Sequence, residues 1–254
     1  MSAPTTTDLW LRRYHPAPAG DVTVVCLPHA GGSASYFRPL SALVSPEFDV
    51  LSVQYPGRQD RRSERPLETI TGLAEEVLAA LRGHAGRRLV LFGHSMGACV
   101  AYEVARRMVA EPSGTLLGLI ASGRCAPSRT RDNGVRLRDD AGVIDEIRAL
   151  NGTDASLLDD DDLVRMILPV VRSDYQAVET YAHQPGPPLP VPVSVLVGDA
   201  DPQVTVAEAN DWRGFTAREF RMRVFPGGHF YLADRQADVA SAIVDDIRRF
   251  ATDN

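Results

Sequence analysis

A serine stands between two glycines in the segment Gly-His-Ser-Met-Gly at residues 93–97. The apolar residues 89–91 before it are typical of a buried parallel strand, and the small apolar residues after it favour a helix packed on a sheet. Ser95 is therefore expected on a sharp turn from strand to helix, which presents its hydroxyl at the carboxyl edge of the sheet. This arrangement predicts a catalytic nucleophile. The alternative is a glycine-rich turn that happens to contain a serine.

A histidine that could activate Ser95 follows another predicted strand. Residues 220–225 form that strand, and His229 follows it in the segment Pro-Gly-Gly-His-Phe. His94 adjoins the nucleophile, but a sharp turn directs its side chain away from Ser95. His29 lies in a glycine-rich loop that it is expected to shape. Of the six histidines, His229 is therefore the expected general base.

Two aspartates could orient the imidazole of His229. Both follow the predicted strand at residues 193–197, in the segment Gly-Asp-Ala-Asp-Pro. We favour Asp201, because it is far enough past the strand to curl back and because Pro202 holds it in an extended conformation. Asp199 remains the alternative. The chosen carboxylate would hold the ring in the correct tautomer and stabilise the imidazolium while His229 takes the proton from Ser95.

The negative oxygen of a tetrahedral intermediate needs hydrogen-bond donors beside Ser95. The strand predicted at residues 22–27 runs into the glycine-rich loop Pro-His-Ala-Gly-Gly-Ser, at the same edge of the sheet. We expect one backbone N–H from Ala30 in this loop and a second from Met96, directly after the nucleophile. These two groups would form an oxyanion hole.

Alternating strands and helices must bring these groups together. Strands are predicted at residues 22–27, 48–53, 116–122, 193–197 and 220–225 besides the one before Ser95, with helices at 67–82 and 234–250. This pattern predicts an α/β fold with a mostly parallel central sheet and helices on both faces. We expect residues 1–254 to form a single domain.

The alternation stops over residues 124–185, which are expected to form a helical lid insertion. A short helix is predicted from Val143 to a stop at Asn151-Gly152, and a second begins in the acidic run at residues 159–162, with a kink at Pro169. Apolar and aromatic residues would line the lid where it covers the active-site edge. The alternative is an ordinary pair of helices packed on the core.

Composition excludes several other classes of protein. The net charge of −6 is not that of a nucleic-acid-binding protein, and no apolar run is long enough to cross a membrane. The first residues lack a secretory signal, and three scattered cysteines give neither a disulfide framework nor a metal site, so we expect a cytoplasmic protein. All 27 basic residues are arginines, with clusters at residues 58–65 and 124–138 that are either solvated or face an acidic partner.

With these residues in view, the chain resembles the type II thioesterases, α/β-hydrolases that accompany polyketide and nonribosomal peptide synthases. The resemblance implies the nucleophile Ser95 with partners Asp201 and His229, oxyanion donors Met96 and Ala30, and no metal or cofactor. It is carried by five segments in family order, at residues 27–34, 55–58, 93–98, 198–202 and 227–232.

The implied reaction is hydrolysis of acyl groups from the phosphopantetheine thiol of an acyl or peptidyl carrier protein. We expect a monomer that binds neither nucleic acid nor membrane, with the arginines at residues 124–138 guiding the acidic carrier. The alternatives are a medium-chain fatty-acyl thioesterase, a carboxylesterase or lipase, and a carrier-binding module without catalysis.

Overall fold

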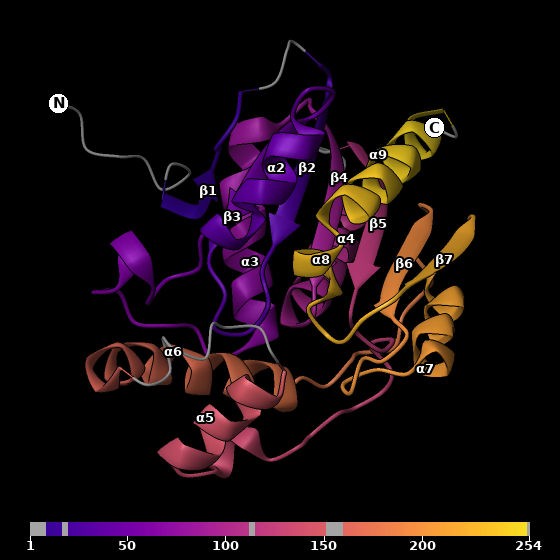
Figure 1. Cartoon of the computed structure of the whole chain (residues 1–254). Coiled ribbons are helices and arrows are strands. Elements are labelled where there is room, and N and C mark those ends of the chain that lie inside the picture. The colour runs from indigo at the N-terminus through magenta and orange to yellow at the C-terminus, as the bar shows by residue number, and fades with distance from the viewer. Residues whose placement is uncertain (1–8, 17–19, 112–114, 151–159, 253–254) are drawn as a thin grey trace, which may run out of the picture.

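A seven-stranded sheet runs through the centre of the protein, and helices cover both of its faces (Figure 1). The computed structural model describes residues 9–16, 20–111, 115–150 and 160–252. The strand order is β1-β3-β2-β4-β5-β6-β7, and every neighbouring pair is parallel except β1 with β3. This is the predicted mostly parallel sheet. The strands are β1 (Leu11–Arg12), β2 (Val22–Leu27), β3 (Asp49–Val53), β4 (Arg88–His94), β5 (Thr115–Ser122), β6 (Val193–Gly198) and β7 (Phe220–Phe225).

The helices fall into groups on the two faces and at one edge of the sheet. Helices α2 and α9 pack against each other on one face, and α3 and α4 do so on the other. Helices α5 and α6 lie across the carboxyl ends of the strands (Figure 1). The helices are α2 (Arg38–Val44), α3 (Ile70–Leu81), α4 (Met96–Ala110), α5 (Asp140–Ala149), α6 (Asp161–Glu179), α7 (Val206–Asn210), α8 (Tyr231–Asp234) and α9 (Gln236–Thr252).

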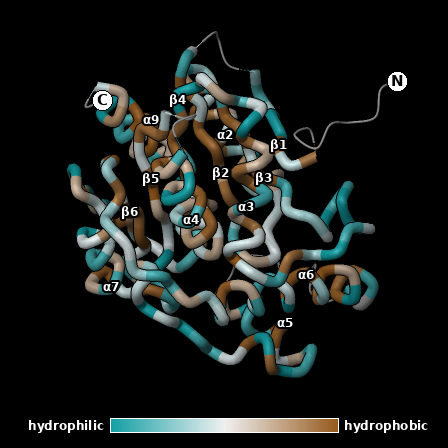
Figure 2. Tube along the Cα trace, turned by 180° about the vertical axis from the view of Figure 1, so that it is seen from behind, coloured by the Kyte–Doolittle hydropathy of each residue, from teal (hydrophilic) through white to brown (hydrophobic). Residues whose placement is uncertain are grey.

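Alternate residues of the central strands supply two hydrophobic layers. In β4, Leu89 and Leu91 join the cluster that contains α3 and α4, whereas Val90 and Phe92 join the cluster that contains α2 and α9. Since both faces of the strand are covered, its apolar run does not alternate with polar residues. Figure 2 shows hydrophobic residues along the central strands and hydrophilic residues along the outer loops.

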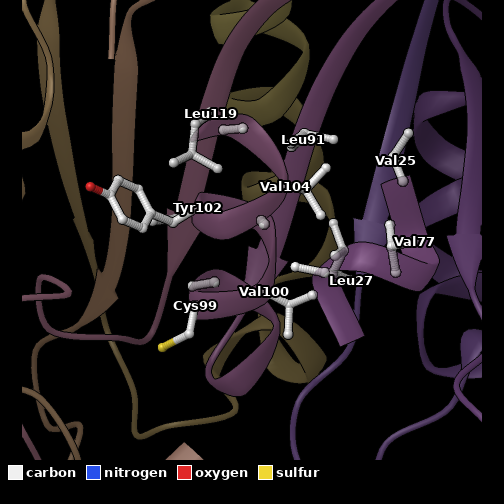
Figure 3. Close-up of a cluster of buried hydrophobic side chains, with 14 of the residues drawn as sticks. Val25, Leu27, Val77, Leu91, Cys99, Val100, Tyr102, Val104 and Leu119 are labelled. Atoms are coloured by element: carbon white, nitrogen blue, oxygen red, sulfur yellow. The ribbon is translucent and has the colours of Figure 1, made fainter. Parts of the chain in front are cut away.

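Helix α4 is the most deeply packed of these helices, and it starts directly after the proposed nucleophile. Eleven of its fifteen residues are buried, among them three alanines that let the helix approach the sheet closely. Figure 3 shows Val100 and Val104 of this helix packed beside Leu27 and Leu91 of the strands, with Val77 of α3 next to them. Full burial of one such aliphatic side chain stabilises the fold by about 1.5–3 kcal/mol.

Helices α5 and α6, here called the cover helices, lie between β5 and β6 in the chain, where a lid was expected. Helix α6 begins at Asp161, with the Asp160 side chain capping it, and continues as one helix through Pro169. Ser173 anchors α6 to the core by donating to the Leu67 carbonyl oxygen at 3.2 Å. The predicted stop at Asn151-Gly152 lies outside the described residues.

Some short strands and helices, and the exact starts of two longer helices, differ from the prediction. The short strand β1 and helices α2 and α7 were not predicted. Helix α3 begins at Ile70, because Thr69 accepts from the Gly72 N–H and so caps it. Helix α9 begins at Gln236, since α8 and Arg235 occupy the preceding residues. In the described part of the chain, no helix has the length and apolarity needed to cross a membrane.

Candidate active site

Ser95 occupies a strained turn between β4 and α4. Its φ of 55° and ψ of −119° lie in a region that non-glycine residues rarely adopt. A side chain on Gly93 would collide with the backbone of Gly97, and one on Gly97 would collide with the Leu27 carbonyl. The Ser95 N–H donates to the Ser122 carbonyl oxygen at 2.8 Å, which fixes the turn against β5. Both flanking glycines are therefore required for the turn to close.

His229 lies between Ser95 and Asp201 in one hydrogen-bonded chain. Its Nε2 is 2.9 Å from Ser95 Oγ, and its Nδ1 is 2.9 and 3.0 Å from the two Asp201 carboxylate oxygens. The carboxylate is fully buried, the ring is 3% exposed, and the Gln203 N–H donates to Asp201 Oδ1 at 2.7 Å. The structure thus brings together three residues that the sequence places after three separate strands. A proton can pass from Ser95 to the ring while the carboxylate stabilises the resulting charge.

Asp199 has a different contact. Its Oδ1 accepts from the Gly227 N–H at 2.9 Å, in the turn that leads to His229. A side chain on Gly198 would collide with the Gly227 and Gly228 carbonyls, so the two loops lie directly against each other. Asp199 therefore joins the loop after β6 to the loop that carries the histidine, while Asp201 is the aspartate that contacts the ring.

Ala30 and Met96 lie on adjacent turns at the same edge of the sheet. Strands β2 and β4 pair with Leu27 opposite Gly93, so the loops that follow them start at the same level. Met96 is the first residue of α4, and its N–H has no acceptor within its own helix. The loop with Ala30 is tightened by a hydrogen bond from the Gly32 N–H to the His29 carbonyl oxygen, at 3.0 Å.

His94 does not contact Ser95 by a hydrogen bond, in keeping with the expectation that its side chain points elsewhere. Its Nδ1 is 3.0 Å from Ser122 Oγ, which is in turn 2.7 Å from the Tyr231 hydroxyl. Burial, with smaller effects of His229 and His29, holds the pKa of His94 well below its usual value. The His94 ring is therefore neutral. It lies close to the His229 ring, with 5.1 Å between the centroids, and does not repel the positive charge that His229 gains on protonation.

A cavity of about 630 Å³ lies between the oxyanion loop and the cover helices. On the loop side the cavity is lined by Ala30 and Gly31. Phe230, which follows His229 in the chain, also lines it. Arg58, Gln59 and Arg62 lie at its polar side. The cover helices and the adjoining Leu150 supply apolar residues: Ile147, Leu150, Leu163, Met166, Ile167 and Val170. This lining fits an acyl chain.

Two residues of the site had little or no signal in the sequence. Arg58 belongs to the Tyr-Pro-Gly-Arg segment that carried the family resemblance, but its contacts were not predicted. Asp174 lies on α6, and nothing in its local sequence sets it apart. The two side chains form a buried ion pair behind the loop that holds Ala30.

The arginines at residues 124–138 are largely engaged within the chain. Arg131 pairs with Glu208 at 2.8 Å, and Arg138 pairs with Glu146 at 3.0 Å. Arg129 pairs with Asp211, and Arg136 contacts both Asp132 and Glu179. Their charges are thus already compensated, which weakens the hypothesis that they guide an acidic partner.

Cys26, Cys99 and Cys125 are buried and free. Within the residues that the structure describes, no group of three or more histidine, cysteine, aspartate or glutamate side chains is arranged to hold a metal ion.

Comparison with known proteins gives consistent matches over nearly the whole chain. The family model described as a thioesterase domain matches residues 22–248. Thioesterase PikA5 of Streptomyces venezuelae is 49% identical over 238 residues, which cover 93% of this chain and 85% of that protein. A probable cadicidin biosynthesis thioesterase of Streptomyces griseus is 46% identical over 249 residues, covering 96% and 69%.

A solved structure agrees with the fold as well. The type II thioesterase BorB from the borrelidin biosynthetic cluster superposes with a TM-score of 0.88 at 46% sequence identity. The match covers 95% of this chain and 99% of that one. It confirms the predicted α/β-hydrolase fold.

Proposed function

The chain belongs to the thioesterase family, and from that premise we propose that it hydrolyses acyl groups from the phosphopantetheine thiol of acyl or peptidyl carrier proteins, by means of Ser95, His229 and Asp201. As a thioesterase it is a hydrolase that acts on thioesters. In the proposed role it edits a polyketide or nonribosomal peptide synthase by removing misplaced acyl groups. The observation that carries the catalytic assignment is the chain of hydrogen bonds from Ser95 through His229 to Asp201.

In the first half of the reaction, Ser95 Oγ attacks the thioester carbonyl carbon as His229 Nε2 takes its proton. The carbonyl oxygen becomes an oxyanion, which accepts hydrogen bonds from the N–H groups of Ala30 and Met96. The tetrahedral intermediate then collapses. The carbon–sulfur bond breaks, His229 gives its proton to the leaving pantetheine thiolate, and the acyl group stays on Ser95 as an ester.

In the second half, water replaces the thiol. His229 removes a proton from the water as its oxygen attacks the acyl-enzyme carbonyl, and the same two N–H groups stabilise the second oxyanion. The carbon–oxygen bond to Ser95 breaks, and His229 returns its proton to the serine oxygen. The products are a free acid and the unchanged enzyme, and each proton transfer in this scheme is made by His229.

The cavity between the oxyanion loop and the cover helices supports an acyl substrate, because its cover side is apolar. We assign residues 124–185 the role of a lid that admits the acyl-pantetheine arm and closes over it. In this proposal the enzyme is a cytoplasmic monomer that meets an acidic carrier protein in solution.

The experiment compares three forms of one acyl group: bound to a carrier protein, to coenzyme A, and as an oxyester. We expect kcat/KM to be highest for the carrier-bound form, since only that form offers a protein surface to bind. Equal values for the carrier and coenzyme A forms would favour a fatty-acyl thioesterase. Preference for the oxyester would favour an esterase or lipase, and no hydrolysis of any form would leave a carrier-binding module.

A further inference from the structure

Asp174 of α6 reaches from the cover helices to the loop that holds Ala30. Its side chain is fully buried. One carboxylate oxygen accepts from the Gly31 N–H at 2.7 Å. The same oxygen accepts from Arg58 Nη1 at 2.8 Å, and the other accepts from Arg58 Nη2 at 2.9 Å. A single carboxylate thus joins helix α6, the loop after β3 and the loop after β2.

Arg58 holds the other end of the same two-glycine segment. Its Nη1 also donates to the Gly32 carbonyl oxygen at 2.9 Å. Gln54 is buried beside it, where its amide donates to the Arg58 carbonyl oxygen and its Oε1 accepts from the Ala34 N–H. The ion pair therefore fixes the N–H of Gly31 and the carbonyl of Gly32, immediately after the residue proposed to supply an oxyanion donor.

The loop depends on this support because its backbone is unusual. Gly31 has a φ of +75°, which disfavours any side chain. A Cβ at this position would also lie 3.0 Å from a methyl group of Val171, so α6 packs directly against the loop. Asp174 therefore remains within reach of Gly31 only while α6 stays in this position.

We propose that Asp174 and Arg58 are positioning residues, which hold the oxyanion loop in its working conformation and make that conformation depend on helix α6. This inference rests on the proposed function, since it takes the Ala30 N–H as an oxyanion donor. Neither side chain touches the reacting atoms in this scheme. When α6 moves away, the Gly31 N–H loses its acceptor and Arg58 loses its counter-charge, so the oxyanion hole is complete only under the seated helix.

Glu179 provides a matched control on the same helix. It is 5% exposed, and its carboxylate also accepts from backbone N–H groups, those of Val135 and Arg136, and from an arginine, Arg136. Those partners belong to a turn at residues 135–137 and not to the loop with Ala30. Substitution of Glu179 therefore disturbs a similar buried network on α6 without releasing the oxyanion loop.

The test measures Asp174→Asn and Glu179→Gln on a small acyl-N-acetylcysteamine thioester, which needs no carrier docking. We expect Asp174→Asn to lower kcat about 10- to 100-fold, with KM changed less than about 3-fold. We expect Glu179→Gln to keep kcat within about 3-fold of wild type. An alkyl boronate that forms a tetrahedral adduct with Ser95 should bind Asp174→Asn more weakly by about the same factor as kcat falls. The pH profile of kcat/KM should keep its shape, because His229 and Asp201 are untouched.

If Asp174→Asn fails to fold, Asp174→Glu provides the same test. It keeps the counter-charge for Arg58 but moves the carboxylate by one methylene, so kcat should still fall at least about 10-fold. Wild-type kcat in a folded Asp174 variant, or an equal fall in Glu179→Gln, would overturn the inference. Failure of the proposed function is distinct, since wild-type enzyme would then leave the thioester intact or Ser95→Ala would still hydrolyse it.

Discussion

The carboxyl edge of the sheet and the cover helices above it are built in different ways. Helix α4, behind Ser95, buries eleven of its fifteen residues, whereas Val143 is the buried residue of α5. Glycines and close backbone contacts fix the sheet edge. The cover helices combine apolar packing, such as that of Ala177 and Val178 of α6 in the main core, with polar contacts to distant loops, such as Asp174 with Arg58 and Gln203 with Glu146.

This difference fits the proposed function, in which the sheet edge holds the reacting groups and the cover helices control access of the substrate. The reacting groups need positions fixed to a fraction of an ångström, and a close-packed core provides that rigidity. In the proposed function the cover helices move to admit a substrate, and that motion would open their contacts with the sheet edge, including the buried pair of Asp174 and Arg58. Changes at the sheet edge should therefore affect chemistry. In the cover helices, changes in the cavity lining should affect which substrates enter, whereas a change at Asp174 should affect chemistry through the oxyanion loop.

Removal of the nucleophile is expected to have the largest effect. Ser95→Ala should lower kcat about 10⁴-fold or more, because no other group can form the acyl-enzyme. His229→Ala should do the same. Rates are measured on a short-chain acyl thioester, and circular dichroism checks that the fold is kept. A folded Ser95→Ala enzyme with more than a tenth of wild-type kcat would exclude Ser95 as the nucleophile.

Asp201→Asn and Asp199→Asn separate the two aspartates at this edge. Asp201→Asn should lower kcat about 10³- to 10⁴-fold, since an amide favours the wrong imidazole tautomer. Asp199→Asn should lower it less than about 10-fold, because its oxygen can still accept from the Gly227 N–H. Steady-state kinetics of both variants show which aspartate acts with His229. The reverse order would reassign the acid to Asp199.

The close backbone packing beneath Ser95 can be tested with a methyl group. Gly97→Ala should reduce the free energy of unfolding by about 3 kcal/mol, because the added Cβ collides with the Leu27 carbonyl. Gly214→Ala is the matched control, since its Cβ would meet no atom within 4 Å. Urea denaturation gives both values. Similar stabilities of the two variants would mean that the sheet edge is looser than described.

A larger side chain in the cover should change selectivity and leave the chemistry intact. Ile167→Trp fills part of the cavity, so kcat/KM for a long acyl chain should fall about 10-fold. The value for an acetyl thioester should stay within about 2-fold. The measurement is a series of acyl thioesters of increasing length. A uniform loss at every length would place Ile167 outside the acyl path.

A smaller effect is expected from the buried histidine next to the nucleophile. Because the pKa of His94 is lowered in the fold, the unfolded chain takes up its proton below about pH 6.5 while the folded chain does not. Stability should therefore fall as pH drops from 6.5 to 5, by up to about 1.4 kcal/mol per pH unit from this residue. His94→Gln should reduce that slope in urea titrations at several pH values. Equal slopes would mean that folding does not lower the pKa of His94.

The same contrast explains what could be predicted from the sequence. The turn at Ser95, its partner His229 and the strand pattern are encoded locally, by glycines and apolar runs that can be read residue by residue. Asp201 could be preferred over Asp199 because it lies far enough past the strand to curl back and because Pro202 restricts the chain, but its hydrogen bond to His229 appears only in three dimensions.

The contacts of the cover could not be predicted, because they join residues far apart in the sequence. Asp174 and Arg58 are 116 residues apart, and an aspartate on an amphipathic helix gives no sign of its partner. The arginines at residues 124–138 stand out as a charge cluster, but only the fold shows that Arg131 and Arg138 meet the chain's own carboxylates. Helix α2 was missed because it is only seven residues long.

Trapping the acyl-enzyme tests the central claim most directly. Wild-type protein mixed with an acylated carrier protein and quenched in acid within milliseconds should gain the mass of the acyl group, on the peptide that contains Ser95. Turnover without any acyl adduct on Ser95, or with the adduct on another residue, would contradict the account.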